Sequence, residues 1–585
     1  MHANTHFKRM LTSMLCLGVV LLLNGCKDFL DLKPVGSVDE DDFYQTLNDL
    51  QLGLNSTYEV LGTDTYQKTE WLFGEGCGDD AIRTVKMSPS SEAGLLVQFN
   101  FTPQNAWILN RWQINYRGIF RANWVISKAA ELPDENINIL DEQNYLPVII
   151  GEAKFLRALY YFNLVKTYGG VPIKPERISV SGDEDNTIQP RSTREEVYRY
   201  IEQDLREALL LVEDRYNFDN FQKGKIDKGA VAALLMKVLA YQAKPGVQDR
   251  KWEQAQLIGE YIVERRRLTY REVLNYDQFY QTEFNPESWT DVVSRLRIQV
   301  DETTTEAEQL EVLIENCQNY SLSPSYELMW VDQGEFHPGS IFEIGHTELR
   351  ETHYTVGTRW DADLGRGNSA GQLQPGNYFR DKAASDPRAA FLFAQGNSAS
   401  LDYVCDELNT ISGTQPDPIK SYCMKWYHPV CQRPTSGTGN SGRNFRVLRF
   451  AEVKLFYAEA LNEMGNRQAA IDQIRELVER ANLIDDRVRD GVSRNLNALQ
   501  LDSYENTRDL IWEERRLEMA FEFDRFWEIV RQGKAAAYMQ EFNSQAAAFG
   551  PLWRKNFQTG INEVFPIPQI EVDLSNGVMV QNPGY

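Results

Sequence analysis

The sequence predicts a mainly α-helical fold: a superhelix of tetratricopeptide-like helical pairs, with a large irregular loop-rich insertion and minor β structure. Small and apolar residues recur at helical spacing over 39–270 and 445–535, in units of about 34–40 residues that are typical of tetratricopeptide-like repeats. Between these regions, 271–445 is rich in Gly, Ser, Asn, Pro and aromatic residues, and its helical period mostly fails. Long irregular insertions on rigid scaffolds are usually functional, so we expect the binding site there.

The clearest helical pair is predicted over 227–266. Its first helix places Ala230 and Ala233 on one face and ends at Lys244-Pro245-Gly246, and its second helix carries Trp252 and further apolar residues at helical spacing. Alanines on facing helices let the two backbones approach closely, and the apolar stripe supplies the buried face.

Three further pairs are predicted. One spans 447–483 and turns at Gly465. Another joins 152–168, which ends in a glycine–proline stop, to 193–212, where Thr193 and Glu196 fit a capping box. The last joins 41–61 to 105–132. Within the insertion, 322–330 predicts a short helix and 341–347 a strand.

Composition and charge exclude several classes of protein. The 585 residues are 42% hydrophobic and 25% charged, which excludes bulk disorder, collagen and a multispanning membrane protein. The formal net charge is −23, and a nucleic-acid partner would need a basic footprint. No phosphate loop or dinucleotide fingerprint is present, and Asp361-Ala-Asp363-Leu-Gly365 lacks the remaining ligands of a calcium loop. We therefore predict no cofactor and no metal site.

The first 26 residues predict a lipoprotein signal. Lys8 and Arg9 precede an apolar stretch over 11–23, which is shorter than the ~20 residues that a bilayer requires. Cys26 follows Asn24-Gly25 and resembles the bacterial lipobox cysteine, whose thiol is acylated with chains such as palmitate. We predict removal of the signal peptide 1–25 and a lipid tether on Cys26; an ordinary secretory signal with an incidental cysteine is the alternative.

Three cysteines lie close together late in the insertion. One disulfide is expected among Cys405, Cys423 and Cys431, and the sequence leaves its connectivity open. The spacing lacks the paired pattern of a zinc site.

Several ordered segments together resemble one family. They are 26–34 (CKDFLDLKP), 78–81 (GDDA), 151–157 (GEAKFLR), 168–172 (YGGVP), 448–462 (LRFAEVKLFYAEALN), 514–527 (ERRLEMAFEFDRFW), 565–568 (FPIP) and 581–585 (QNPGY). This set is similar to the SusD/RagB family of outer-membrane nutrient-binding lipoproteins. The resemblance covers nearly the whole mature chain and is poor at roughly 345–445, where members differ in ligand.

The resemblance implies a function as well as a fold. Family members sit on the outer face of the outer membrane, lipid-anchored, and cap a TonB-dependent, SusC-like transporter to which they hand an oligosaccharide, or a peptide in the RagB branch. They are not enzymes and have no cofactor. We expect an N-terminal helical region over 26–270, a ligand-binding insertion over 271–445 and a C-terminal helical region over 446–585, together forming one body.

The candidate ligand-binding residues follow from the chemistry of sugars. A neutral sugar offers a C–H face to an aromatic ring and hydroxyls to planar polar groups. The richest such cluster lies in the insertion: Tyr354, Arg359, Trp360, Asp361, Asp363, Asn368 and Gln372. The alternative is that Trp360 packs the loop onto the scaffold.

Two smaller clusters are also candidates. Trp71 with Asp79 and Asp80 forms one, although the two aspartates could instead cap the next turn. Trp426 forms the other, as a stacking platform or as a core residue. Trp330 ends an apolar helical pattern and is expected in the core.

The acidic and basic run over 513–525 allows a different interpretation. Glu518 and Glu522 share a helical face, as the acid and base of a glycoside hydrolase would. The interleaved arginines would hold these carboxylates ionised, which opposes the raised pKa of a general acid. We therefore predict a structural ion-pair network. A peptide binder, a glycoside hydrolase and a docking protein without a small ligand remain the alternatives.

Overall fold

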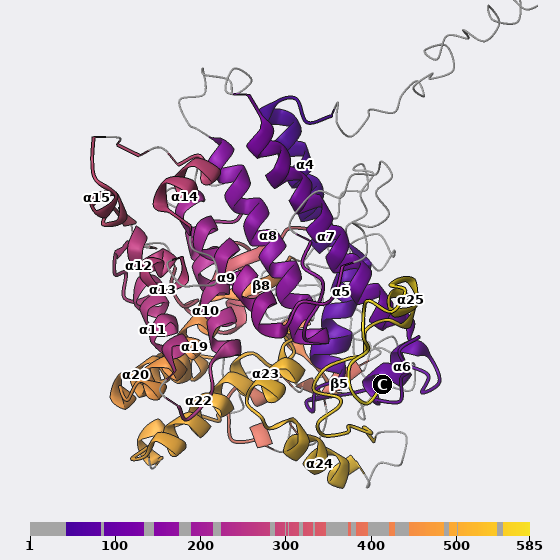
Figure 1. Cartoon of the computed structure of the whole chain (residues 1–585). Helices are drawn as coiled ribbons and strands as arrows, with labels where there is room; N and C mark the ends of the chain where they lie inside the picture. Colours follow the sequence, from indigo (N-terminus) through magenta and orange to yellow (C-terminus); the bar gives the residue numbers. More distant parts are fainter. Residues whose placement is uncertain are drawn as a thin grey trace, which may run out of the picture.

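The computed structural model describes most of the chain from residue 43 onward. It covers 43–83, 87–133, 145–174, 189–214, 224–280 except 248, 287–346 except 299, 302, 315–316, 318–319 and 331–333, 373–375, 379, 382–395 except 393, 421–426, 444–484, 491–546 except 500, and 554–585. Figure 1 shows these residues as a helical body whose N-terminal helices, at the top, are long and roughly aligned.

The N-terminal half is a layer of packed helices. They are α4 (Leu47–Gly62), α5 (Asp64–Glu70), the π-helical segment η1 (Trp71–Gly76), α6 (Glu92–Val97), α7 (Ala106–Glu131), α8 (Tyr145–Tyr168) and α9 (Arg194–Leu211). Helix α4 packs on α7, α7 on α8 and α8 on α9, which confirms the predicted pairs of 41–61 with 105–132 and of 152–168 with 193–212. Helix α8 is buried on nearly every face, and its buried charged residues Lys154 and Arg157 pair with Asp204 of α9.

A second group of helices completes the scaffold. It comprises α10 (Lys228–Gln242), α11 (Arg250–Val263), α19 (Phe450–Glu463), α20 (Arg467–Ala481), α22 (Tyr504–Glu518), α23 (Arg525–Arg531), α24 (Ala535–Ala546) and α25 (Gln569–Leu574). Helices α10 and α11 form one predicted pair and α19 and α20 the other, and α11 packs on α19. At that crossing, a Cβ on Gly259 would lie 2.1 Å from the Tyr457 ring, so only glycine permits the close approach.

The local signals at helix ends are confirmed. The Thr193 side chain accepts a hydrogen bond from the Glu196 backbone N–H, and the Glu196 carboxylate accepts one from the Thr193 backbone N–H. Gly169, directly after α8, has a φ of +72°, a left-handed conformation that glycine adopts without strain.

The insertion is more ordered at its start than predicted. Four short helices lie there: α12 (Tyr270–Leu274), α13 (Tyr276–Phe279), α14 (Trp289–Leu296) and α15 (Glu306–Leu310). Each has eight residues or fewer, which is too short for a 3.6-residue period to stand out from the sequence. The predicted short helix over 322–330 is the 3-10 helix η4 (Glu327–Trp330), and its Trp330 is buried in the core as expected.

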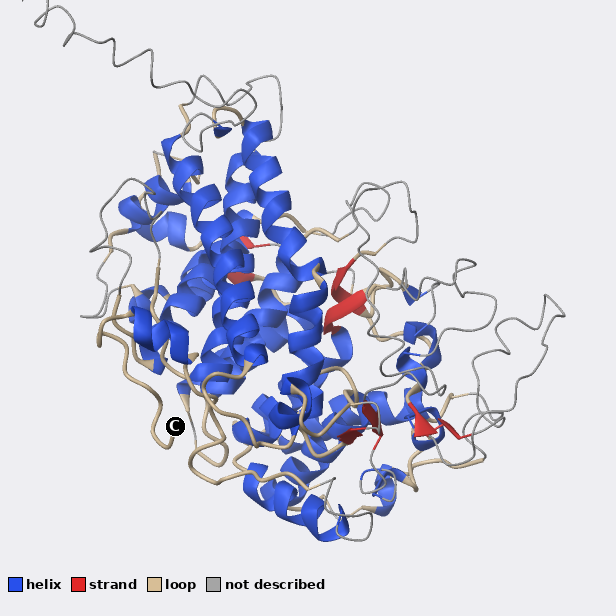
Figure 2. Ribbon diagram, turned by 90° about the vertical axis from the view of Figure 1, so that its right-hand side faces the viewer, coloured by secondary structure: helices blue, strands red, loops and turns tan. Residues whose placement is uncertain are grey.

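The described strands are short and pair only in twos. They are β1 (Ala81–Arg83), β2 (Leu268–Thr269), β3 (Leu313–Ile314), β4 (Ser340–Ile344), β5 (Leu373–Pro375), β6 (Ala394–Gln395), β7 (Ser421–Tyr422) and β8 (Phe445–Arg449). The antiparallel pairs are β1–β5, β2–β3, β4–β8 and β6–β7, with no larger sheet among the described residues. Figure 2 shows them as short, separate pieces, some among the helices and others at the side of the helical body.

The pairing of β4 with β8 closes the middle of the insertion. Ile344 lies opposite Phe445 and Ser340 opposite Arg449, so the chain leaves and returns at the same place. Strand β8 continues directly into α19, which ties this point to the scaffold. Among the helices of the described ranges, none combines the length and apolar character needed to cross a membrane.

Candidate functional site

The two loops predicted to carry the ligand site meet at the β1–β5 pair. Ala81 lies opposite Pro375, and Arg83 opposite Leu373. Strand β1 follows the loop that starts at Trp71, and β5 directly follows 347–372, which lies outside the described residues. This pairing could not be expected from the sequence, because each strand has only three residues.

The main cluster of candidate residues lies within that undescribed stretch. It comprises Tyr354, Arg359, Trp360, Asp361, Asp363, Asn368 and Gln372. The lipidation site predicted at Cys26 also lies outside the described residues. Both assignments stay predictions.

Trp71 is not a ligand-stacking residue. It begins the π-helix η1 and is only 1% exposed, so no sugar could reach its ring. Three residues later, a Cβ on Gly74 would lie 1.7 Å from the Phe523 carbonyl oxygen, so the chain segment after α22 lies directly against η1. Gly74 therefore permits tight packing at this point.

Asp79 and Asp80 are buried ion-pair partners and are not available to a ligand. Arg525 Nε donates to Asp79 Oδ1 at 2.7 Å, and Arg516 Nε donates to Asp80 Oδ1 at 2.8 Å. Burial opposes the charged form of Asp79, but the two arginines outweigh it and hold the pKa of Asp79 well below its usual range. The expectation of ligand contacts here was wrong, because arginines occupy both carboxylates. These arginines lie more than 400 positions downstream, so a local sequence pattern does not reveal them.

Glu75 occupies the same buried region without a partner. Neither carboxylate oxygen of Glu75 has a hydrogen bond to a described residue. Burial, reinforced by the nearby Asp80 carboxyl, raises the pKa of Glu75 well above its ordinary value. Glu75 therefore lies in the core, where burial disfavours its charged form.

Trp426 is a core residue, which corrects its assignment as a ligand platform. It is 1% exposed, and its Nε1 donates to the Phe521 carbonyl at 2.8 Å. Its ring stacks on Phe523 with centroids 5.1 Å apart and planes 9° from parallel. Cys423 is a free buried thiol, so the expected disulfide does not include it, and Cys405 and Cys431 lie outside the described residues.

Buried ion pairs fasten the insertion to helix α22 and to the segment that follows it; the sequence predicted a structural ion-pair network in this run, but between packed helices. Arg388, which is fully buried, donates to both carboxylate oxygens of Glu514, at 2.7 and 3.0 Å. Lys425 Nζ donates to Glu522 Oε1 at 2.5 Å. Bidentate, desolvated pairs of this kind have fixed geometry, so the insertion has a rigid base.

The same network opposes the role of a glycosidase acid for Glu518. Burial alone would raise its pKa, but Arg480, Arg449 and Arg388 outweigh burial and hold the pKa of Glu518 well below its ordinary range. Arg480 Nη2 lies 2.5 Å from Glu518 Oε1. A carboxylate held ionised in this way cannot deliver a proton to a leaving group. Among the described residues, no group of three or more His, Cys, Asp or Glu side chains is arranged to hold a metal ion.

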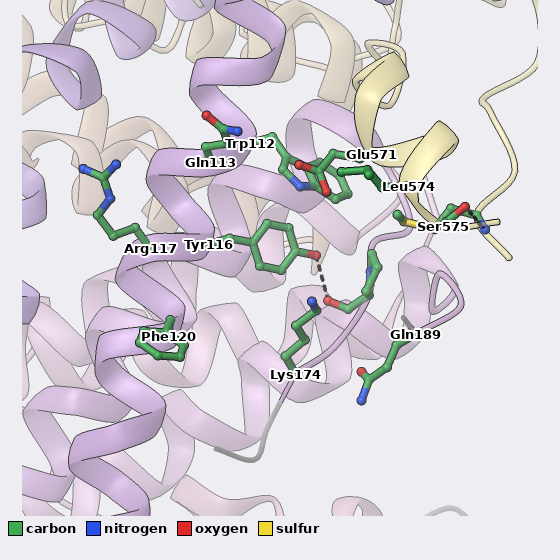
Figure 3. A pocket seen from close by; sticks show the side chains of 12 residues that line it. Trp112, Gln113, Tyr116, Arg117, Phe120, Lys174, Gln189, Glu571, Leu574 and Ser575 are labelled. Carbon is green, nitrogen blue, oxygen red and sulfur yellow. Dashed lines mark hydrogen bonds between the residues drawn. The ribbon is translucent and has the colours of Figure 1, made fainter. Parts of the chain in front are cut away.

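The sequence did not single out a cleft that lies between α7 and the C-terminal helix α25. Its volume is about 570 Å³. Its lining residues come from α7, the segments that flank 175–188, and the end of the chain: Trp112, Gln113, Tyr116, Arg117, Phe120, Pro172, Lys174, Gln189, Glu571, Leu574, Ser575 and Met579 (Figure 3). The aromatic residues at positions 112, 116 and 120 are a signal of this wall in the sequence. The C-terminal residues that line the opposite wall lie more than 400 positions later, so the sequence does not reveal the cleft.

Comparison with protein families places this chain. The model of the SusD family matches 376–585, and a model described as "Starch-binding associating with outer membrane" matches 28–239. The chain belongs to the SusD/RagB family. This SusD-like chain is 25% identical over 561 residues to SusD-like protein P38 of Formosa agariphila, covering 94% of this chain and 96% of that protein. It is 26% identical over 580 residues to SusD-like protein P2 of the same organism, covering 97% and 98%.

Solved structures of the family share the fold of this SusD-like chain. A laminarin-binding SusD-like protein aligns with a TM-score of 0.62 at 24% identity, over 93% of this chain and all of that one. Surface glycan-binding protein A from Bacteroides thetaiotaomicron, solved with laminarihexaose, aligns with a TM-score of 0.63 at 19% identity, over 92% of this chain and all of that one. The mainly helical fold predicted from the sequence is thereby confirmed.

Proposed function

We propose that this chain is a cell-surface lipoprotein that binds extracellular oligosaccharide and delivers it to a TonB-dependent, SusC-like transporter in the outer membrane. Membership of the SusD/RagB family, matched near both ends of the chain, carries the proposal. The glycans named for two structures of the same fold, laminarin and laminarihexaose, support an oligosaccharide as the ligand class. The function is reversible binding, with no covalent bond of the ligand broken.

The proposed binding segment runs between β4 and β5. Its two ends are held by strand pairs, β4 with β8 and β5 with β1, so a ligand that binds it meets a supported loop. Aromatic stacking and hydrogen bonds from planar polar groups would hold the sugar. The residues proposed for these contacts are Tyr354, Arg359, Trp360, Asp361, Asp363, Asn368 and Gln372.

The anchor is proposed at Cys26. Each buried methylene contributes ~0.8 kcal/mol, so two or three acyl chains hold the protein at a membrane where one chain would bind only marginally. Replacing Cys26 by serine should release the chain from the membrane fraction, as measured by fractionation and by loss of incorporated labelled palmitate. Retention of Cys26→Ser in the membrane would contradict the anchor.

The binding proposal is tested with the full chain in a detergent that has no sugar headgroup. Isothermal titration with hexasaccharides of glucose, xylose, mannose, galactose and arabinose should find at least one ligand. Trp360→Ala should weaken that binding by tenfold or more, because one stacking ring contributes at least ~1.4 kcal/mol. The exposed Leu483 (67% exposed) offers a control, and Leu483→Ala should bind normally.

Three results would contradict the proposal. A chain that binds peptides but none of the hexasaccharides is a RagB-like peptide binder. Release of reducing ends during incubation would indicate a hydrolase. If no SusC-like transporter copurifies with this chain from solubilised outer membranes, the proposed delivery to such a transporter is contradicted.

A further inference from the structure

The cleft between α7 and α25 is built as a binding site and is separate from the proposed loop site. Figure 3 shows side chains from α7 on one side and from the C-terminal segment on the other, around an open space. Its volume of about 570 Å³ lies within the ~300–1,000 Å³ range of small-ligand clefts. No strand among the described residues lines it, so the β1–β5 pair is not part of it.

Aromatic rings form one wall. Trp112, Tyr116 and Phe120 follow one another at four-residue spacing on α7, so each ring is about 6 Å further along the helix axis. Trp112 is 4% exposed and forms the deepest part, whereas Phe120 is 39% exposed at the edge. In this ladder of rings, the half-buried Tyr116 and the exposed Phe120 offer stacking surface to a ligand, whereas Trp112 is buried and closes the apolar wall.

Planar polar groups surround these rings. Gln113, Arg117 and Gln189 line the cleft and make no hydrogen bond or ion pair with another described residue. Gln113 and Arg117 are exposed, each one position after a ring of the ladder. Two amides and a guanidinium are therefore available to exchange hydrogen bonds with a ligand's hydroxyl groups.

The charges in the cleft are of both signs, and they favour a neutral ligand. Burial raises the pKa of Glu571 above its ordinary value and lowers the pKa of Lys174 below its own, so each charge is weakened by desolvation. Lys174 Nζ also lies 5.9 Å from the centre of the Tyr116 ring. An anionic ligand would meet the Glu571 carboxyl, and a cationic ligand would meet Arg117 and Lys174.

Hydrogen bonds hold the walls of the cleft in place. The Tyr116 hydroxyl donates to the Pro172 carbonyl at 2.8 Å, which fixes the ring (Figure 3). The Lys174 backbone N–H donates to the Tyr161 hydroxyl at 2.7 Å. A site whose walls are already fixed loses little entropy when it binds.

The C-terminal wall is held by a clamp that joins two family segments, 168–172 and 581–585. Asn582 Nδ2 donates to the Tyr168 carbonyl at 3.0 Å and to the Phe565 carbonyl at 2.7 Å. Arg191 donates to the Val580 carbonyl and to Asn582 Oδ1, both at 2.7 Å. These bonds place α25 and the residues after it opposite the ring ladder.

We propose that this cleft is a second oligosaccharide-binding site, which takes a neutral glycan against Tyr116 and Phe120 of the ring ladder. Peptide binding by strand addition is disfavoured, because no described strand borders the cleft. The choice of ligand class rests on the proposed function; the existence of the site rests on the cleft itself.

The test counts bound ligands. Native mass spectrometry of the full chain in sugar-free detergent, with the same hexasaccharides, gives the number bound per chain. The double variant Arg117→Ala/Phe120→Ala should lose one bound molecule, or bind it at least tenfold more weakly. Both positions are exposed, so the variant should fold normally. Phe120→Tyr, which keeps the ring, should retain the molecule, and Leu483→Ala is the control on another surface.

The outcomes separate the two proposals. Loss of a bound molecule in the double variant supports the cleft whether or not Trp360→Ala also loses one. An unchanged count in the double variant overturns the cleft and leaves the proposed function intact. A wild-type chain that binds none of the hexasaccharides contradicts both. Hydrogen exchange gives a further check, because the bound glycan should protect backbone amides in 569–580.

Discussion

Replacing Arg388 by methionine should test whether buried ion pairs hold the insertion on the scaffold. The Arg388 guanidinium is fully buried and donates to Asp386 at 2.8 and 2.9 Å, to Glu514 at 2.7 and 3.0 Å and to Glu518 at 3.2 Å. Methionine has a similar length but no charge, so the variant leaves these carboxylates in the core without their shared cation.

The size of the effect follows from the burial of the carboxylates that remain. Removing one partner of a buried pair costs ~3–5 kcal/mol, because the other charge stays desolvated. At ~2.1 cal/mol/K per residue, a cooperative unit of this chain's size has an unfolding entropy of about 1.2 kcal/mol/K, so the melting temperature should fall by about 3–4 °C. The assay is thermal unfolding followed by circular dichroism at pH 7.

The effect of Arg388→Met should also depend on pH. Burial alone would raise the pKa of Asp386, but Arg388 outweighs burial and lowers it. A lowered folded-state pKa stabilises the protein above the unfolded pKa of about 3.9, and that contribution is lost as pH falls through the folded value. The gap between wild type and variant should therefore be larger at pH 7 than at pH 3.

A matched arginine on the surface provides the control. Arg475 pairs with Asp472 at 3.9 Å, and both side chains are more than one third exposed. Exposed pairs of this kind contribute ~0–1 kcal/mol, so Arg475→Met should melt within about 1 °C of the wild type. If Arg388→Met melted no lower than Arg475→Met, the reasoning from buried charge would be refuted.

Three other variants or measurements test the corrected core residues. Trp71→Ala should lower the unfolding free energy by ~3–5 kcal/mol, as measured by denaturant titration, and should leave the glycan affinity per folded molecule unchanged. Weaker affinity at unchanged stability would instead show that Trp71 belongs to the binding site. Glu75→Gln should gain stability relative to the wild type as pH rises from 4 to 8, because a buried acid with a raised pKa destabilises the folded protein above the unfolded pKa of that acid. A stability difference between the two proteins that is independent of pH would show that Glu75 does not titrate in this range. Burial raises the pKa of Cys77 and of Cys423 to about 12, so neither thiol should react with maleimide at pH 8 until the protein unfolds. Peptide mass spectrometry measures the labelling, and rapid labelling of the native protein would contradict their burial.

The helical scaffold could be predicted because its signals are local. Apolar residues at helical spacing identified the pairs α10–α11 and α19–α20, and the capping box at Thr193 and Glu196 marked the start of α9. Each of these signals lies within about one helical pair and needs no knowledge of the rest of the chain.

The candidate site could be predicted less well because its residues are placed by distant partners. Asp79 looked like a surface group until Arg516 and Arg525, far downstream, paired with it. The glycine-rich stretch after Trp71 was expected to contact a ligand, but its Gly74 allows close packing on Phe523. In each case a polar or flexible local pattern was overridden by long-range packing that a single sequence does not report.

The pairing of Ile344 with Phe445 brings the two ends of the segment between them to one point on the scaffold. Because strand β8 runs directly into α19, a change of length in any stretch of the segment that does not pack against the scaffold leaves α19 in place. Doubling the length of a closed loop costs only ~0.6 kcal/mol in chain entropy. Such changes must keep β5, Arg388, Lys425 and Trp426, which join the segment to the scaffold, so one helical frame tolerates many lengths between these fixed contacts.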